Sequence, residues 1–127
     1  MLLDTHIFLW LQTMPERLGA HLGTIENGDI ELFVSAATSW EIAIKYELGR
    51  LKLPEPPAVY VPDRIRAIGA RSVTIEHGHA LDVAELPPIH RDPFDRMLVA
   101  QAAALGIPLM TADPVVASYA GDSVLIR

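Results

Sequence analysis

The chain has 127 residues and a formal net charge of −6; half of its residues are hydrophobic and 20% are charged. These values fit one globular domain with its own core and exclude a disordered chain, and the absence of cysteine excludes disulfides and thiolate metal sites. We expect neither a signal peptide nor a membrane span, because Asp4 interrupts the first apolar run and no segment holds about 20 apolar residues. The cytoplasm is therefore the expected location.

Short apolar runs alternate with segments of helical periodicity along the chain. In chain order, we predict a strand at 1–4, helices at 7–11 and 15–26, a strand at 31–35, a helix at 36–48, a proline-rich loop or broken helix start at 51–62, a helix at 63–70, a strand at 72–75, helices at 77–86 and 93–105, a strand at 108–110, a helix at 115–119 and a strand at 124–126. This alternation predicts an α/β fold, a single-domain α/β/α sandwich over residues 1–127 with a mostly parallel sheet of four to five strands. Right-handed crossovers then place the first and fourth strands side by side.

The predicted helix at 93–105 has the clearest boundary signals. Asp92 is a standard N-cap residue, Pro93 suits the first helical position, and Gly106 suits the stop. Taken alone, Asp92 and Asp95 are explained by capping and by the helix dipole. Thr5 is expected to cap the helix that follows the first strand.

Four acidic side chains lie where predicted strands meet helices. Asp4 ends the first strand and Asp113 follows the fourth, whereas Glu41 and Asp95 lie in the early turns of helices. Because the carboxyl ends of parallel strands meet at one edge of a sheet, all four can project over that edge, with Asp92 as a candidate fifth member.

Such a cluster is costly without a partner. Two carboxylates about 5 Å apart repel by roughly 3 kcal/mol at an effective dielectric of about 20. The acids must therefore spread apart, take up protons or share a cation, and oxygen ligands without cysteine favour one or two Mg²⁺ or Mn²⁺ ions over Zn²⁺. Phosphodiester hydrolysis is the chemistry that such ions support. Net negative charge alone argues against a nucleic-acid partner, but bound cations would reverse the local field.

Four stretches of the sequence resemble motifs of a known family. The matching stretches are Leu-Leu-Asp-Thr-His at 2–6, Ser-Trp-Glu-Ile-Ala-Ile-Lys at 39–45, His-Arg-Asp-Pro-Phe-Asp-Arg-Met-Leu-Val-Ala-Gln-Ala at 90–102 and Leu-Met-Thr-Ala-Asp at 109–113. The chain resembles PIN-domain nucleases, and in particular the VapC-type toxins of toxin–antitoxin pairs. The resemblance implies a PIN-like fold, a Mg²⁺- or Mn²⁺-dependent endoribonuclease with an RNA substrate, a small cognate antitoxin that also binds operator DNA, and a homodimer.

The resemblance also assigns roles to the acids. By matching motifs, Asp4, Glu41, Asp95 and Asp113 correspond to the family's acidic site, and Asp92 is either a further ligand or only the helix cap. We expect Asp4 and Asp95 to bind the first ion directly and Asp113 to bind it directly or through water. Glu41 would bind a second ion or orient the attacking water.

Several neighbours of these acids have two interpretations each. Three hydroxyl groups would either hold metal-bound waters and phosphate oxygens or act as caps and turn residues: those of Thr5, Ser39 and Thr111. Arg96 would contact the scissile phosphate or form a salt bridge with a neighbouring acid. Lys45 is spaced to pair with Glu41 at i+4 along a helix.

Other residues give weaker signals. His77 and His79 are two apart and so point different ways on a helix, which argues against zinc. A cap or packing role is favoured over RNA contact for His6 and His90. For the aromatic residues at helical spacing, core positions are favoured over base stacking; these are Trp10, Trp40 and Tyr46. For the arginines, a solvated face is favoured over an RNA path; these are Arg64, Arg66 and Arg71.

Two other classes of protein stay open. A receiver-type phosphotransfer domain also gathers acids and Mg²⁺ above a parallel sheet, but it needs a phosphoacceptor Asp after the third strand, where this chain has Thr74-Ile75-Glu76. A protein–protein module that keeps an acidic metal site only for stability would show no catalysis.

Overall fold

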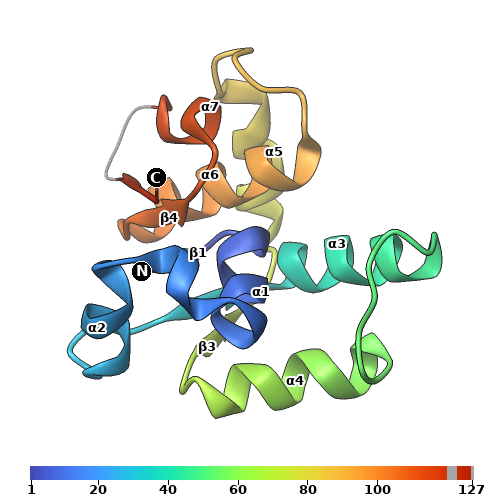
Figure 1. Cartoon of the computed structure of the whole chain (residues 1–127). Coiled ribbons are helices and arrows are strands. Elements are labelled where there is room, and N and C mark those ends of the chain that lie inside the picture. The colour runs from blue at the N-terminus through green and yellow to red at the C-terminus, as the bar shows by residue number, and fades with distance from the viewer. Residues whose placement is uncertain (120–122, 127) are drawn as a thin grey trace.

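A computed structural model describes residues 1–119 and 123–126 and shows a five-stranded sheet between layers of helices (Figure 1). Every strand pair is parallel, and the strand order is β3-β2-β1-β4-β5. The strands are β1 Leu2–Leu3, β2 Phe33–Ser35, β3 Arg71–Val73, β4 Leu109–Thr111 and β5 Ser123–Leu125. The α/β class, the parallel sheet and the pairing of the first strand with the fourth are confirmed.

Helices separate each strand from the next along the chain. They are α1 Thr5–Thr13, η1 Pro15–Leu18, α2 His21–Glu26, α3 Ala36–Glu47, α4 Pro57–Ala67, α5 His77–Asp82, η2 Val83–Glu85, α6 Pro93–Leu105 and α7 Pro114–Ala117. Within the part of the chain that the structure describes, none of them combines the length and the apolar content that crossing a membrane requires.

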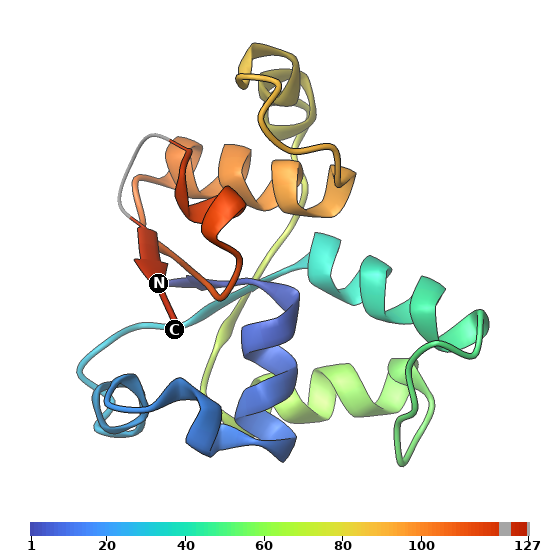
Figure 2. The same ribbon diagram turned by 45° about the horizontal axis from the view of Figure 1, so that its top comes forward.

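The sheet separates two apolar cores, because successive side chains of a strand point to opposite faces. Leu3 belongs to the core beneath α1, α2 and α4, and its neighbour Leu2 belongs to the core beneath α6 and α7. Both leucines are fully buried, as expected for a central parallel strand. Figure 2 shows α6 and α7 on one side of the sheet and α1, α2 and α4 on the other.

Several predicted elements have different bounds in the structure, and two of these differences involve glycine or proline. The predicted helix at 15–26 is broken into η1 and α2, because Gly19 adopts a left-handed φ of 57° that a continuous helix cannot contain. For 51–62, where a loop or the broken start of a helix is predicted, the structure has a loop up to Pro56 and then α4, which begins at Pro57 and contains Pro62. The burial of Tyr60 and Val61 stabilises the helix and offsets the cost of the backbone hydrogen bond that Pro62 cannot donate.

The prediction that Trp40 and Tyr46 lie in the core is wrong. Trp40 is 60% exposed and stacks edge-on against Phe94, with ring centroids 5.2 Å apart, and Tyr46 is also exposed. The buried face of α3 instead carries Ala37, Thr38, Glu41 and Ile42. The core-facing stripe of α3 is therefore partly polar, and apolar periodicity alone does not identify which side of the helix is buried.

Candidate active site

Asp4 follows β1 directly and is the N-cap of α1, so the predicted cap at Thr5 lies one residue too late. Its Oδ1 accepts a hydrogen bond from the Ile7 backbone amide at 2.9 Å. The side chain is almost fully buried, and this burial raises the pKa of Asp4 against the opposing effect of hydrogen bonds from Thr111 and Ile7. The Asp4 side chain is thus held in a buried position at the carboxyl end of β1.

Asp113 occupies the equivalent place after β4, the neighbouring strand. It is the N-cap of α7, and its Oδ1 accepts a hydrogen bond from the Val115 amide at 2.8 Å. The Thr111 hydroxyl accepts a hydrogen bond from the Asp113 amide at 3.0 Å, which fixes the turn between strand and helix. Because one oxygen serves the cap, Oδ2 is left to face the sheet edge.

The two acids at the start of α6 have different environments. Asp92 is the cap, with Oδ1 accepting from the amides of Phe94 at 2.8 Å and Asp95 at 3.1 Å. The Asp95 side chain is 21% exposed, and its Oδ2 lies 2.7 Å from His90 Nε2. The pKa of Asp95 is raised to about 6, mainly by burial and also by the charges of Asp92 and Glu41, against the opposing hydrogen bond with His90.

Glu41 is buried in α3, and both of its carboxylate oxygens have partners. The Thr5 hydroxyl donates to Oε1 at 2.7 Å, and Lys45 forms an ion pair with Oε2. The predicted i+4 pair is therefore present. The charge of Glu41 also raises the pKa of Asp4 and of Asp95, so this acid lies near both.

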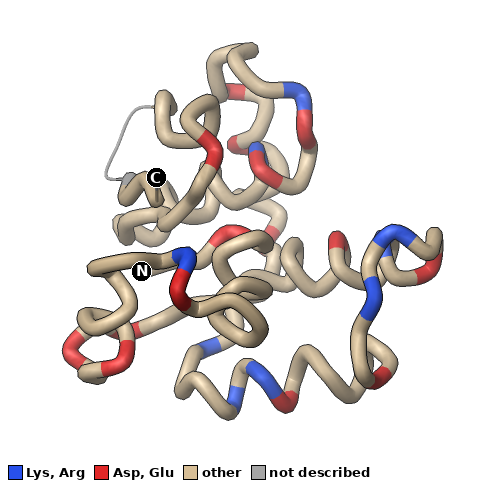
Figure 3. Tube along the Cα trace, in the orientation of Figure 1, with Lys and Arg blue, Asp and Glu red and all other residues tan. Residues whose placement is uncertain are grey.

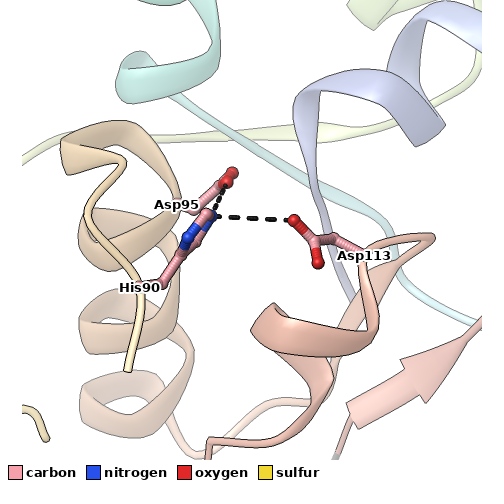
Figure 4. Close-up of side chains that lie close together, drawn as sticks. All are labelled: His90, Asp95 and Asp113. Carbon is pink, nitrogen blue, oxygen red and sulfur yellow. Dashed lines mark hydrogen bonds and ion pairs between the residues drawn. The ribbon is translucent and has the colours of Figure 1, made fainter. Parts of the chain in front are cut away.

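Three of the predicted acids line one pocket of about 350 Å³, formed by Asp4, His6, Trp10, Asp95, Ala112, Asp113 and Pro114. His90 lies at the same place (Figure 4), with Nε2 2.7 Å from Asp95 Oδ2 and 3.6 Å from Asp113 Oδ2. One atom from each of His90, Asp95 and Asp113 lies within 4.8 Å of the others, a spacing that a single metal ion can bridge. The donor set of carboxylates and one imidazole fits a divalent cation.

Ser39 lies apart from the acids, and within the described residues Arg96 does not form the expected salt bridge with a neighbouring acid. Ser39 lines a separate groove with residues of α4, and its neighbour Thr38, one helical position earlier, faces the Thr5 hydroxyl at 3.2 Å. The Arg96 guanidinium donates to the Tyr119 hydroxyl and to the backbone carbonyls of Val83, Pro87 and His90, because that loop turns its carbonyls toward α6. Arg96 therefore holds the loop before α6.

His90 is the site residue that sequence reasoning set aside. It lies two positions before the helix cap, in a loop without periodicity, so its direction could not be read from spacing. The available signal was its place at the start of the motif that contains Asp92 and Asp95. Arg96 and Tyr119, which hold its backbone, come from other elements of the fold.

The arginines favoured for a solvated face do lie in surface ion pairs. Arg64 and Arg66 pair with Asp63, and Arg71 pairs with Glu31 at 2.6 Å. Figure 3 shows these basic residues along α4 and β3, at the opposite end of the view from α7. Two acids, Asp63 and Glu31, thus pair with the three arginines.

A model of the PIN domain matches residues 1–122 of this chain. The chain belongs to the PIN domain family. This PIN domain is 33% identical over 115 residues to Ribonuclease VapC22 of Mycobacterium tuberculosis, a match that covers 89% of this chain and 86% of VapC22. It is 52% identical over 48 residues to Ribonuclease VapC16 of the same organism, covering 38% of this chain and about a third (34%) of VapC16.

The fold of this PIN domain also resembles a solved complex. The crystal structure of DNA-bound VapBC from Salmonella typhimurium contains a chain that matches with a TM-score of 0.67 at 16% identity, covering 97% of this chain and 94% of that one. The expected resemblance to VapC-type PIN domains is confirmed by these matches.

Proposed function

We propose that this PIN domain, taken as residues 1–127, is a divalent-metal-dependent endoribonuclease that acts in the cytoplasm as the toxin of a toxin–antitoxin pair. The observation that carries the proposal is the meeting of Asp4, Asp95 and Asp113 around one pocket at the carboxyl edge of the sheet. These residues come from three separate elements. The match to a relative named as a ribonuclease over 86% of its length supports the same activity.

The energetics of the pocket support a bound cation. Asp95 and Asp113 each offer an oxygen within 4.8 Å of the other, and carboxylates at about 5 Å repel by roughly 3 kcal/mol at an effective dielectric of about 20. Burial raises the pKa of Asp4 and of Asp95, so the pocket disfavours unpaired negative charge. One or two Mg²⁺ or Mn²⁺ ions would relieve this repulsion. When bound, such an ion activates water and stabilises charge on a phosphate.

Each acid has a role in this proposal that its environment supports. Asp95 and Asp113 each direct an oxygen toward the same point, where they would hold the ion, and Asp4 would bind it from the buried side. Glu41 is held by Thr5 and Lys45, which suits orienting water better than binding an ion directly. Asp92 acts as a helix cap, since one of its oxygens accepts two backbone hydrogen bonds.

The partners of the proposed toxin are a second copy of the chain and a DNA-binding antitoxin. A solved structure with a similar fold is a VapBC complex bound to DNA, which supports an antitoxin partner of this kind. An antitoxin would neutralise the nuclease by occupying the surface around the acidic pocket.

The test is cleavage of structured RNA by the purified chain with Mg²⁺ or Mn²⁺, with and without EDTA. We expect chelator-sensitive cleavage that Asp4→Asn abolishes. Asp63→Asn, which alters an exposed acid of α4, is the matched control and should cleave normally. Stabilisation by metal with no cleavage would instead support the non-catalytic module, and cleavage by Asp4→Asn would contradict the proposed site.

A further inference from the structure

We propose that His90 is a direct ligand of the divalent ion and that its nitrogen makes the site prefer Mn²⁺ to Mg²⁺. This inference rests on the proposed metal dependence and adds a residue outside the acidic set. It assigns the metal preference to the loop before α6.

The positions of the atoms support ligation by His90. In an octahedral site with ligands at about 2.1 Å, adjacent ligand atoms are about 3.0 Å apart and opposite ones about 4.2 Å. His90 Nε2 lies 2.7 Å from Asp95 Oδ2 and 3.6 Å from Asp113 Oδ2, on either side of the adjacent-ligand distance (Figure 4). The three side chains converge from a loop, α6 and the turn after β4. Small side-chain adjustments would let all three bind one ion.

The backbone around His90 is anchored, so that its ring is presented to the pocket. The His90 amide donates to the Tyr119 hydroxyl at 2.9 Å, and its carbonyl accepts from Arg96. Arg96 also binds the carbonyl of Val83 at 2.8 Å and that of Pro87 at 3.1 Å, which ties the rest of the loop to α6. This support of a ligand by surrounding hydrogen bonds is usual in metal sites.

The nitrogen has a chemical consequence for metal choice. Mg²⁺ is a hard ion that binds oxygen ligands and keeps several waters, so an imidazole adds little to its affinity. Mn²⁺ accepts the same carboxylates and six-coordinate geometry but is a transition ion that also binds imidazole. A mixed set of carboxylates and one histidine therefore favours Mn²⁺.

His90 could instead donate a hydrogen bond to Asp95 and orient it without touching the ion. That arrangement weakens Mg²⁺ and Mn²⁺ binding to the same extent when His90 is replaced, because each ion loses only the support of Asp95. If His90 is a direct ligand, its replacement weakens Mn²⁺ binding more than Mg²⁺ binding, and a nitrogen atom lies at the ion in the wild type. The two arrangements thus differ in measurements that do not involve catalysis.

The experiment uses the full chain without RNA. Mn²⁺ binding is titrated by electron paramagnetic resonance, Mg²⁺ binding is measured by competition, and the spin-echo modulation of bound Mn²⁺ is recorded for ¹⁴N. His90→Gln is compared with His6→Gln, a histidine that lines the same pocket outside the three-residue group. His90→Asn is the second variant, and circular dichroism checks that each is folded.

We expect nitrogen modulation in the wild type and in His6→Gln, and its loss in the folded His90 variants. We also expect the Mn²⁺ dissociation constant of these variants to rise by about tenfold or more and that of Mg²⁺ by less than about threefold. Nitrogen modulation that survives in the His90 variants, or equal losses for both ions, would overturn the inference. Mn²⁺ bound by oxygens alone in an active nuclease overturns the inference only, whereas the absence of any metal binding overturns the proposed function as well.

Discussion

Burial of the Asp95 carboxylate has a measurable effect on folding when no divalent ion is bound. Its pKa is raised to about 6 in the folded chain and is about 3.9 in an unfolded one. Between these values the folded state binds more protons, so stability falls as pH rises from about 4 to about 6. Asp4, whose pKa is also raised, contributes in the same direction.

We therefore expect Asp95→Asn to stabilise the metal-free protein at pH 7 by about 1–2 kcal/mol, after allowance for partial solvent screening. The gain should disappear near pH 4, where the wild-type carboxyl is already protonated. Urea denaturation in EDTA at both pH values measures this difference. Asp63→Asn should change little at either pH, and a loss of stability in Asp95→Asn at pH 7 would contradict the assigned burial effect.

The Thr5 hydroxyl is the second point at which a single residue should matter. It donates to the buried Glu41 carboxylate at 2.7 Å, so Thr5→Val would leave a buried charged oxygen without a partner. We expect a loss of about 1–3 kcal/mol in the free energy of unfolding. Thr13→Val removes an exposed helical hydroxyl and is the control, with an effect within about 0.5 kcal/mol. Equal effects of the two variants would refute the importance of this contact.

At the scale of elements, α6 carries the site because its first turn is fixed. Asp92 caps the helix, Pro93 begins it and Gly106 ends it with a φ of 65°. This anchoring sets the direction of the Asp95 side chain. Asp95 faces the pocket from the first turn of α6, and Leu98 on the same helix packs into the core. The cap and the proposed ligand are thus separate functions of neighbouring acids.

A pair of variants tests that separation. Asp92→Ala should lose about 1 kcal/mol of stability, because two backbone amides lose their acceptor, whereas Asp92→Ser should retain most of it. Both variants should bind Mn²⁺ with a dissociation constant close to that of the wild type. Urea denaturation and Mn²⁺ titration measure the two properties. A large loss of Mn²⁺ affinity in Asp92→Ser would identify Asp92 as a ligand.

At the scale of the whole molecule, the parallel sheet order makes the site. β1 and β4 are neighbours although more than a hundred residues separate Leu2 from its partner Leu109. The acids after these two strands therefore lie at one edge, while the two cores on either face of the sheet hold the strands in register. Metal binding and folding should consequently be coupled.

We expect Mn²⁺ at about 100 times its dissociation constant to stabilise the folded chain by about 2.7 kcal/mol at neutral pH. The effect should shrink below pH 6, because protons compete for Asp95. Thermal unfolding with Mn²⁺, and with EDTA as the metal-free reference, measures it. Asp4→Asn should gain much less from the ion, and an equal gain in that variant would argue against a shared site.

The sequence by itself was sufficient for the class of fold, most of the elements and the meeting of Asp4, Asp95 and Asp113 at one edge of the sheet. Alternating apolar runs predict a parallel sheet, and the boundary signals around α6 predict its start and stop because capping is a local interaction. Asp4 and Asp113 could be placed together since both follow neighbouring strands of that sheet. These predictions depend on chemistry within a few residues or on general rules of topology.

Only the tertiary structure decided which neighbours of the acids join them. His90 lies beside Asp95 and Asp113 because Arg96 and Tyr119 hold its loop, and Ser39 lies away from them because the partly polar face of α3 turns inward. The continuation of α4 through Pro62 likewise depends on the burial of Tyr60 and Val61. In each case the outcome depends on contacts between segments far apart in the chain, and local propensity carries no information about such contacts.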